Sequence, residues 1–330
     1  MFPFRGLTFR GPFRLAAMPS PDAPQSPALA LPDTPDALAK KLAKTYIVDE
    51  RTALVAYLAL LLDKPLLCEG PAGVGKTELA RALALALDRP LLRLQCYEGL
   101  DEGKALYEWD YGKQLLYTQL LRDSVAEKVR GAPDMSEALA RLSGEESVFY
   151  SERFLVARPL LAAMTSDVPV VLLVDEVDRA DPEFEALLLE VLAENQVTVP
   201  ELGTFRAKHR PLVLLTTNGA RDMSDALRRR CIHAFLDYPS PAREVAILEL
   251  RVPGLGDALA KALVRFVATL RGLELRKVPS ISETIDWARA LVLLGKSALD
   301  RTVVDETLGL LLKYEEDRDK VSDALDKLLV

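Results

Sequence analysis

Apolar residues in this 330-residue chain gather in short runs that alternate with longer segments of helical periodicity. Short, nearly unbroken apolar runs are typical of parallel strands that are covered on both faces. Five such runs separated by helical segments predict an α/β fold with a five-stranded parallel sheet. The expected strands are Leu66–Glu69, Leu91–Cys96, Val170–Asp175, Leu212–Thr217 and Ile232–Leu236.

The pattern changes after Pro239 and Pro241, beyond which apolar positions recur only at helical spacing. The clearest examples are Leu259, Leu263, Phe266, Val267 and Leu270, and then Val321, Leu325, Leu328 and Leu329. A repeat of three or four residues places these side chains on one face of a helix. We therefore expect an αβα core over residues 36–239 and a small all-helical domain over residues 240–330.

Residues 1–35 contain 8 of the 21 prolines, and the residues between them are mostly small or polar. Such a segment buries too little apolar surface to offset its ordering entropy, which predicts a disordered leader. Met18 is an alternative start within it.

The longest apolar candidate for a membrane span, Leu54–Leu62, is far shorter than the roughly 20 residues required. We expect a cytoplasmic protein.

The composition narrows the choice of partner and of metal chemistry. Lys plus Arg is 42 and Asp plus Glu is 49, so the net charge of −7 gives no electrostatic reason to expect nucleic acid as the main partner. Cys68, Cys96 and Cys231 lie in apolar runs without paired spacing, which indicates buried thiols. His209 and His233 lack companion ligands nearby in the sequence, which disfavours a histidine zinc site.

A glycine-rich loop follows the first expected strand and precedes an expected helix, Glu78–Leu87. Its pattern, G-x-x-x-x-G-K-T, turns backbone N–H groups toward phosphate oxygens at a helix N-terminus. Lys76 would reach the β- and γ-phosphates, and the Thr77 hydroxyl would coordinate Mg²⁺. A plain glycine turn is the alternative, but the strand–loop–helix order favours nucleotide binding. The expected binding residues are Gly70, Pro71, Ala72, Gly73, Val74, Gly75, Lys76, Thr77 and Glu78.

The third expected strand ends in two carboxylates, Asp175 and Glu176. At the carboxyl end of a parallel strand, Asp175 would hold Mg²⁺, and Glu176 would orient and deprotonate the attacking water. An acidic pair at a helix start is the alternative reading. A carboxylate at this position, where many small GTPases use glutamine, indicates an ATPase.

Two further groups follow this acidic pair. Asn218, directly after Leu212–Thr217, could hydrogen-bond the nucleophilic water and sense the γ-phosphate, with Thr217 as the near alternative. An asparagine that merely ends a strand is the competing interpretation. The run Arg228–Arg230 follows an expected short helix, Met223–Leu227. It is either a solvated charged face or the source of an arginine finger that acts across a subunit interface.

Together, GPAGVGKT, VVLLVDEVDRA, LLTTN and ALRRRC, followed by a helical lid, resemble the AAA+ superfamily over residues 36–330. Asp175–Ala180 resembles the DEINRA or DEIDRA signature of MoxR ATPases. The segment Gln196–Val199 resembles part of the strand pair that those proteins place before the third motif. Leu100–Leu161 resembles their insertion before the acidic strand.

More narrowly, several segments resemble the CoxD branch of MoxR proteins, which assists maturation of molybdenum-containing carbon monoxide dehydrogenase and its relatives. They are Gln95–Asp101, Ala105–Trp109, Pro200–Thr204 and Ser282–Trp287. The resemblance implies a hexameric ring, a partner with a von Willebrand factor A domain and a client metalloenzyme.

The resemblance also assigns roles to individual residues. Arg230 best matches the arginine finger, with Arg229 second, and Gln95 matches a residue that restrains the catalytic glutamate between turnovers. Many MoxR proteins carry a lid arginine in a Ser-Pro-Arg setting, but Ser280–Glu283 has none, and Arg289 lies two turns further on.

These observations favour Mg²⁺-dependent ATP hydrolysis that drives remodelling or cofactor maturation of a client protein. An AAA+ motor or loader that acts on nucleic acid is the first alternative, and a non-catalytic nucleotide switch is the second.

Overall fold

The computed structural model describes residues 31–122, 150–200 and 202–328, together with the isolated positions 130, 134 and 137. The expected leader falls mostly on residues 1–30, which lie outside the described residues. The described chain enters its first helix, α1 (Pro35–Leu42), through an N-cap at Thr34, whose side chain accepts a hydrogen bond from the N–H of Ala37. Proline at the first helical position suits this start because its fixed φ is already helical.

Five parallel strands form the central sheet, in the order β2-β5-β8-β1-β9. Their bounds match the five apolar runs, except that β2, β5 and β9 are each one residue shorter than expected. The strands are β1 (Leu66–Glu69), β2 (Leu91–Gln95), β5 (Val171–Asp175), β8 (Leu212–Thr217) and β9 (Ile232–Phe235). The α/β fold class with a five-stranded parallel sheet is therefore confirmed.

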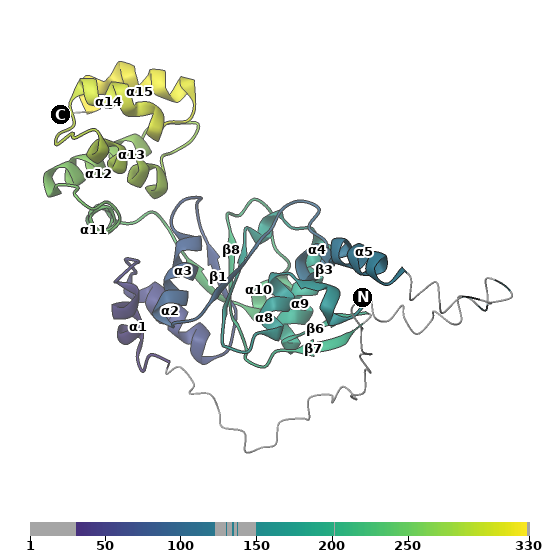
Figure 1. Ribbon diagram of the computed structural model, residues 1–330. Coiled ribbons are helices and arrows are strands. Elements are labelled where there is room, and N and C mark those ends of the chain that lie inside the picture. The colour runs from purple at the N-terminus through teal and green to yellow at the C-terminus, as the bar shows by residue number, and fades with distance from the viewer. Residues whose placement is uncertain are drawn as a thin grey trace, which may run out of the picture. The chain divides into compact units, whose positions relative to one another are not determined.

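Helices cover both faces of this sheet (Figure 1). Successive side chains of a strand point to opposite faces, so Leu66 and Cys68 pack in one core cluster and Leu67 in the other. The first cluster includes residues of α1, α2 (Glu50–Leu61) and α3 (Lys76–Ala86). The second includes residues of α4 (Glu102–Leu106), α8 (Pro159–Thr165), α9 (Pro182–Glu194) and α10 (Asp225–Arg230). Burial on both faces explains why the strand sequences are almost wholly apolar.

Among the described residues, two short antiparallel strand pairs accompany the sheet. One pairs β3 (Tyr107–Trp109) with β4 (Leu155–Ala157), and α5 (Tyr111–Leu120) follows β3. The other pairs β6 (Gln196–Val199) with β7 (Gly203–Arg206), so the strand pair expected before β8 is present. Single 3₁₀ turns, η1 (Glu152–Phe154) and η2 (Val177–Arg179), precede β4 and follow β5.

After Pro241 the described chain is helical, as the sequence predicts. The helices are α11 (Pro241–Arg251), α12 (Asp257–Arg271), α13 (Ile281–Leu293), α14 (Arg301–Leu311) and α15 (Glu315–Leu328). They enclose a separate hydrophobic cluster that contains all five apolar positions expected on α12. Leu329 lies outside the described residues.

A buried ion pair joins the first two helices of this lid. Arg271 of α12 donates to both carboxylate oxygens of Glu244 on α11, at 2.7 and 2.8 Å. Its Nε donates to the carbonyl of Pro279, and its guanidinium lies over the ring of Tyr238. The Glu244 side chain is 1% exposed and that of Arg271 is 13% exposed. Arg271 therefore links α11, α12 and the segment that leads into α13.

We expect Arg271→Leu to lower the free energy of unfolding by about 3–5 kcal/mol, because it leaves the Glu244 carboxylate buried without a partner. Replacing both residues by leucine should recover part of that loss, since the uncompensated charge is then gone. Urea unfolding followed by circular dichroism measures both effects. A single variant as stable as the wild type would contradict the structural role of this pair.

Candidate functional site

The site lies where the strands end. Parallel strands present their carboxyl ends at one edge of a sheet, and ligands bind in the crevice there. The glycine-rich loop Gly70–Gly75, called the phosphate loop from here on, follows β1 at this edge. It leads directly into α3 (Lys76–Ala86). This start is two residues earlier than the predicted Glu78, because Gly75 itself serves as the N-cap with a φ of 99°. Lys76 and Thr77 therefore lie in the first turn, where unpaired N–H groups attract anions.

Two glycines of the loop are fixed by close approaches. A Cβ at Gly70 would lie 1.9 Å from the carbonyl oxygen of Leu236, and the φ of Gly70 is 153°. A Cβ at Gly73, where φ is 74°, would lie 2.1 Å from the Ser280 hydroxyl. Only glycine relieves both the backbone strain and the collision at these positions. The loop is thus held between the end of β9 and the start of lid helix α13.

Lys76 is buried, and its ammonium group donates three hydrogen bonds. Its Nζ donates to the carbonyls of Gly70 and Pro71, both at 2.7 Å, and to Oδ1 of Asn218 at 2.8 Å. Burial lowers the pKa of Lys76, and the nearby carboxylate of Asp178 opposes that shift. Lys76 and Asn218, which are predicted from separate motifs, are therefore in direct contact.

Asp175 lies at the centre of the site and is 3% exposed. The Thr77 hydroxyl lies 3.0 and 3.2 Å from its two carboxylate oxygens, and the Thr216 hydroxyl lies 2.5 Å from Oδ1. A hydroxyl and a carboxylate are the hard oxygen donors that Mg²⁺ prefers. The positions of Thr77 and Asp175 therefore fit the predicted Mg²⁺ site, with the remaining ligands supplied by nucleotide phosphates and water.

Glu176 adopts a left-handed backbone conformation, with φ 56° and ψ 51°. This conformation is uncommon for a residue other than glycine. Its N–H donates to the Thr216 hydroxyl at 2.8 Å, which fixes the backbone against β8. Its Oε2 accepts hydrogen bonds from Gln95 at 3.1 Å and from Arg179 at 2.9 Å. The contact between Gln95 and Glu176 that the resemblance implies is therefore present.

The loop after β8 is shaped by Asp178, which the sequence analysis treated only as part of a signature. Its Oδ2 accepts hydrogen bonds from the N–H groups of Asn218 and Ala220, at 3.2 and 2.9 Å. The near alternative to Asn218, Thr217, uses its hydroxyl to accept a hydrogen bond from the N–H of Gly219. Asn218, and not Thr217, is the residue whose side chain contacts Lys76.

These groups line one pocket. Its walls include the phosphate loop, both carboxylates of the acidic motif, the tip of β8 and one lid residue. They are Ala72, Gly73, Gly75, Lys76, Thr77, Glu78, Asp175, Glu176, Thr216, Asn218 and Ser282. The phosphate loop and the two later motifs, which lie about 100 or more residues from it in sequence, therefore converge on a single cavity, as the nucleotide hypothesis requires.

The helix that carries the three arginines differs from the predicted one. The expected helix Met223–Leu227 is shifted, because the Ser224 side chain caps a helix at Asp225 that continues to Arg230. The arginines are therefore inside α10 and point in different directions. Arg228 pairs with Glu69 at 3.1 Å, whereas Arg229 and Arg230 are exposed. Neither exposed arginine lines the phosphate pocket of its own chain.

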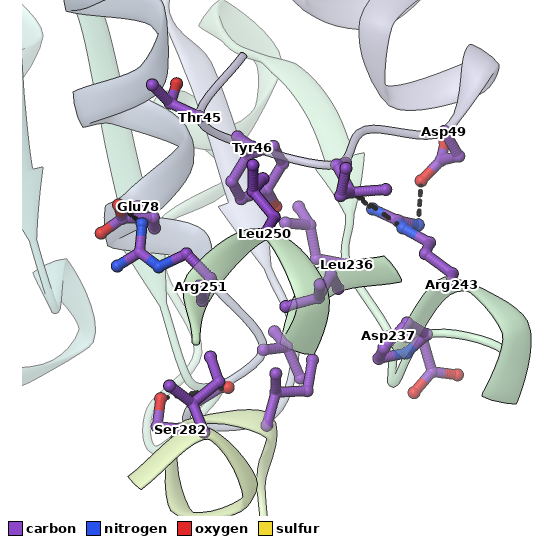
Figure 2. Close-up of a pocket in the computed structure, with 18 residues that line it drawn as sticks. Thr45, Tyr46, Asp49, Glu78, Leu236, Asp237, Arg243, Leu250, Arg251 and Ser282 are labelled. Atoms are coloured by element: carbon purple, nitrogen blue, oxygen red, sulfur yellow. Dashed lines mark hydrogen bonds and ion pairs between the residues drawn. The ribbon is translucent and has the colours of Figure 1, made fainter. Parts of the chain in front are cut away.

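A second pocket adjoins the first, and the sequence analysis missed it (Figure 2). The two pockets share Gly73, Gly75, Glu78 and Ser282. Apolar side chains form most of the additional wall, namely Tyr46, Ile47, Val74, Leu236, Pro239, Ile247, Leu250, Ile281 and Ile285. An apolar cavity that continues from a phosphate loop suits a nucleobase. Its lining comes from four separate parts of the chain, so no local sequence motif predicts it.

Two arginines of lid helix α11 border this second pocket. Arg243 donates to the Ile47 carbonyl at 2.9 Å and to the Asp49 carboxylate at 2.7 Å. Arg251 pairs with Glu78 of α3 at 2.6 Å (Figure 2). Both contacts join the lid to the α/β core beside the phosphate loop.

Serines, and not an arginine, begin the lid helix that touches the phosphate loop. Ser280 caps α13, and the Ser282 hydroxyl approaches the Gly73 carbonyl at 3.5 Å. Arg289, the candidate substitute, pairs with Asp286 at 3.4 Å and lines neither pocket. The lid cation that reaches the phosphate-loop helix is instead Arg251, on a different helix.

Cys68, Cys96 and Cys231 are buried and unpaired with one another, and burial raises the pKa of each thiol to about 12. Within the described ranges, no group of three or more His, Cys, Asp or Glu side chains is placed to hold a metal ion. No described helix is long and apolar enough to span a membrane.

Residues 49–205 match the AAA ATPase domain family model. The chain is 24% identical over 279 residues to an uncharacterized protein, SH1500, of Staphylococcus haemolyticus (strain JCSC1435), with 80% of this chain and 90% of that protein covered.

The solved structures that resemble it include two of RuvB from Thermotoga maritima. A RuvB mutant matches with a TM-score of 0.47 and 16% identity over 89% of this chain and 77% of that one. A structure described as the RuvB Holliday junction branch migration motor matches with a TM-score of 0.44 and 18% identity, over 84% and 74% of the two chains. The match of residues 49–205 to the AAA ATPase domain model supports an ATPase-type activity for this part of the chain.

Proposed function

We propose that this protein is a Mg²⁺-dependent ATPase whose turnover remodels a client protein. The observation that carries the enzymatic part is the convergence of Lys76, Thr77, Asp175, Glu176 and Asn218 at one edge of one sheet. A site that only binds nucleotide needs the phosphate loop. A carboxylate placed next to the metal ligand serves hydrolysis as well.

Each residue of the site has a distinct role in this proposal. The N–H groups of the phosphate loop and the Lys76 ammonium bind the phosphates, for which Lys76 exchanges its present carbonyl and amide partners. Thr77 and Asp175 hold Mg²⁺, which neutralises phosphate charge when bound. Glu176 turns from Gln95 and Arg179 toward a water molecule and accepts its proton, while Asn218 positions that water.

Glu176→Gln should abolish measurable ATP turnover, a loss of at least about 100-fold, because the amide cannot accept the proton of the attacking water. Nucleotide affinity should stay within a few-fold of wild type, since the phosphate loop is intact. Phosphate release and binding of a fluorescent ATP analogue measure the two effects. Glu190→Gln, the same change on the exposed face of α9, is the matched control. Unaffected hydrolysis in Glu176→Gln would rule out the assigned role.

The exposed arginines of α10 extend the proposal to a ring. Arg229 and Arg230 are exposed and do not line the phosphate pocket of their own chain, so either can stabilise transition-state charge only on a neighbouring protomer. Arg230 is our first choice for this arginine finger and Arg229 the second. A homo-oligomeric ring, with six subunits as the sequence resemblance implies, supplies that neighbour.

Arg230→Ala should lower turnover by about 1,000-fold while leaving nucleotide binding intact, because an arginine finger acts on the transition state. Lys76→Ala should also be inactive, since it lacks phosphate binding. When the two variants are mixed, some Arg230→Ala protomers lie beside a Lys76→Ala protomer. Such a site has an intact Lys76 of its own and receives Arg230 from its neighbour, so turnover should return. Absence of recovery in rings shown to contain both variants would exclude Arg230, and the same mixing with Arg229→Ala tests the second choice.

The client is proposed from the sequence resemblance to MoxR proteins of the CoxD branch. On that basis the ring acts with a protein that bears a von Willebrand factor A domain and assists maturation of a molybdenum-containing metalloenzyme. The acidic net charge of −7 supports a protein client over a nucleic-acid backbone.

Addition of double- or single-stranded DNA at about 0.1 M salt should leave ATP turnover unchanged, because a nucleic-acid motor or loader would be stimulated by its substrate. The same assay is run with the von Willebrand factor A protein encoded nearest to this chain, which should change turnover. Stimulation by DNA alone, lost at high salt, would overturn the client-remodelling proposal in favour of the nucleic-acid alternative.

A further inference from the structure

Arg93 of β2 contacts the centre of the site, although no motif includes it. Its Nε and Nη2 donate to Oδ2 of Asp175, at 3.1 and 2.6 Å. The same Nη2 donates to Oε1 of Gln95 at 2.6 Å. Arg93 and Gln95 are two residues apart on one strand, so their side chains leave the same face of the sheet. The pairing of β2 with β5 sets Gln95 opposite Asp175, which brings all three groups together.

The contact with Asp175 is electrostatically important. The Asp175 side chain is 4% exposed, and that of Arg93 is 44% exposed. Among the described residues, Arg93 is the cation in direct contact with this carboxylate. A buried carboxylate gains most from one close cation, and a second cation at the same oxygens is repelled by the first. Arg93 and a divalent cation are therefore competitors for Asp175.

The contact with Gln95 fixes the direction of its amide. An arginine side chain has only donors, so the Gln95 carbonyl oxygen must face Arg93. The amide NH₂ then faces away, where it donates to Oε2 of Glu176 at 3.1 Å. Without Arg93 the amide could turn over and present its oxygen to the carboxylate, which repels it. The orientation that restrains Glu176 thus depends on Arg93.

We propose that Arg93 is a positioning residue that competes with Mg²⁺ for Asp175 and, through Gln95, sets the orientation of Glu176. Departure of Arg93 from Asp175 frees the Gln95 carbonyl and weakens the hold on Glu176. The same guanidinium therefore couples metal binding to release of the general base. This inference rests on the proposed hydrolytic function and adds a residue to it.

The first test is a Mg²⁺ titration of the full chain with a fluorescent, non-hydrolysable ATP analogue, read by anisotropy. Arg93→Met keeps an unbranched apolar stem and removes the charge. It should lower the Mg²⁺ concentration for half-maximal binding by about three- to fivefold, because a half-exposed competing cation is gone. Binding in EDTA should not change. Arg265→Met, which removes an exposed lid arginine, should leave the Mg²⁺ midpoint at the wild-type value.

A wild-type Mg²⁺ midpoint in folded Arg93→Met would overturn the inference. If circular dichroism shows that Arg93→Met does not fold, Arg93→Gln replaces it, because its polar amide is neutral and so also removes the competing charge. The inference then requires that the replacement variant have a Mg²⁺ midpoint below that of the wild type. Failure of the proposed function is recognised separately, as unchanged analogue binding in Lys76→Ala.

The second test is a double-mutant cycle on basal ATP turnover without a partner protein. If Arg93 acts on Glu176 through Gln95, Arg93→Met and Gln95→Ala should each raise basal turnover by a similar factor, and the double variant should rise no further. A purely structural role for Arg93 predicts additive effects, or a loss of turnover in Arg93→Met alone. Either of those results would contradict the coupling.

Discussion

The structure of the site depends on one buried carboxylate, that of Asp175. Side chains from three other elements donate to its oxygens, namely Thr77 of α3, Arg93 of β2 and Thr216 of β8. A buried carboxylate without such donors would be strongly destabilising. These hydrogen bonds to Asp175 therefore bring the phosphate loop, the acidic motif and the tip of β8 together.

The hydrogen bonds around Asp175 also hold the neighbouring residue, Glu176. Its left-handed backbone is held by the hydrogen bond from its N–H to Thr216, the residue that also donates to Asp175. Its side chain is held by Gln95 and Arg179. Asp175 and Glu176, which we propose as metal ligand and general base, therefore share the support of Thr216.

The lid contributes to the site through contacts that differ from the expectation. Ser280 and Ser282 place the start of α13 against Gly73, while Arg251 of α11 contributes the positive charge that pairs with Glu78. The apolar cavity between these elements continues from the phosphate loop. Nucleotide binding at this junction would engage the core and the lid together.

The sequence alone determined the parts whose chemistry is local. The five strands, the phosphate loop after β1 and the acidic pair after β5 depend on contiguous residues, since apolar runs, glycines and a following helix fix the backbone without help from distant segments. Only the tertiary structure revealed Arg93 on Asp175, Arg251 on Glu78 and the separation of Arg228 from Arg230 around α10. These contacts depend on strand register, on the seating of the lid and on where a helix begins, and none of those is encoded by neighbouring residues in the chain.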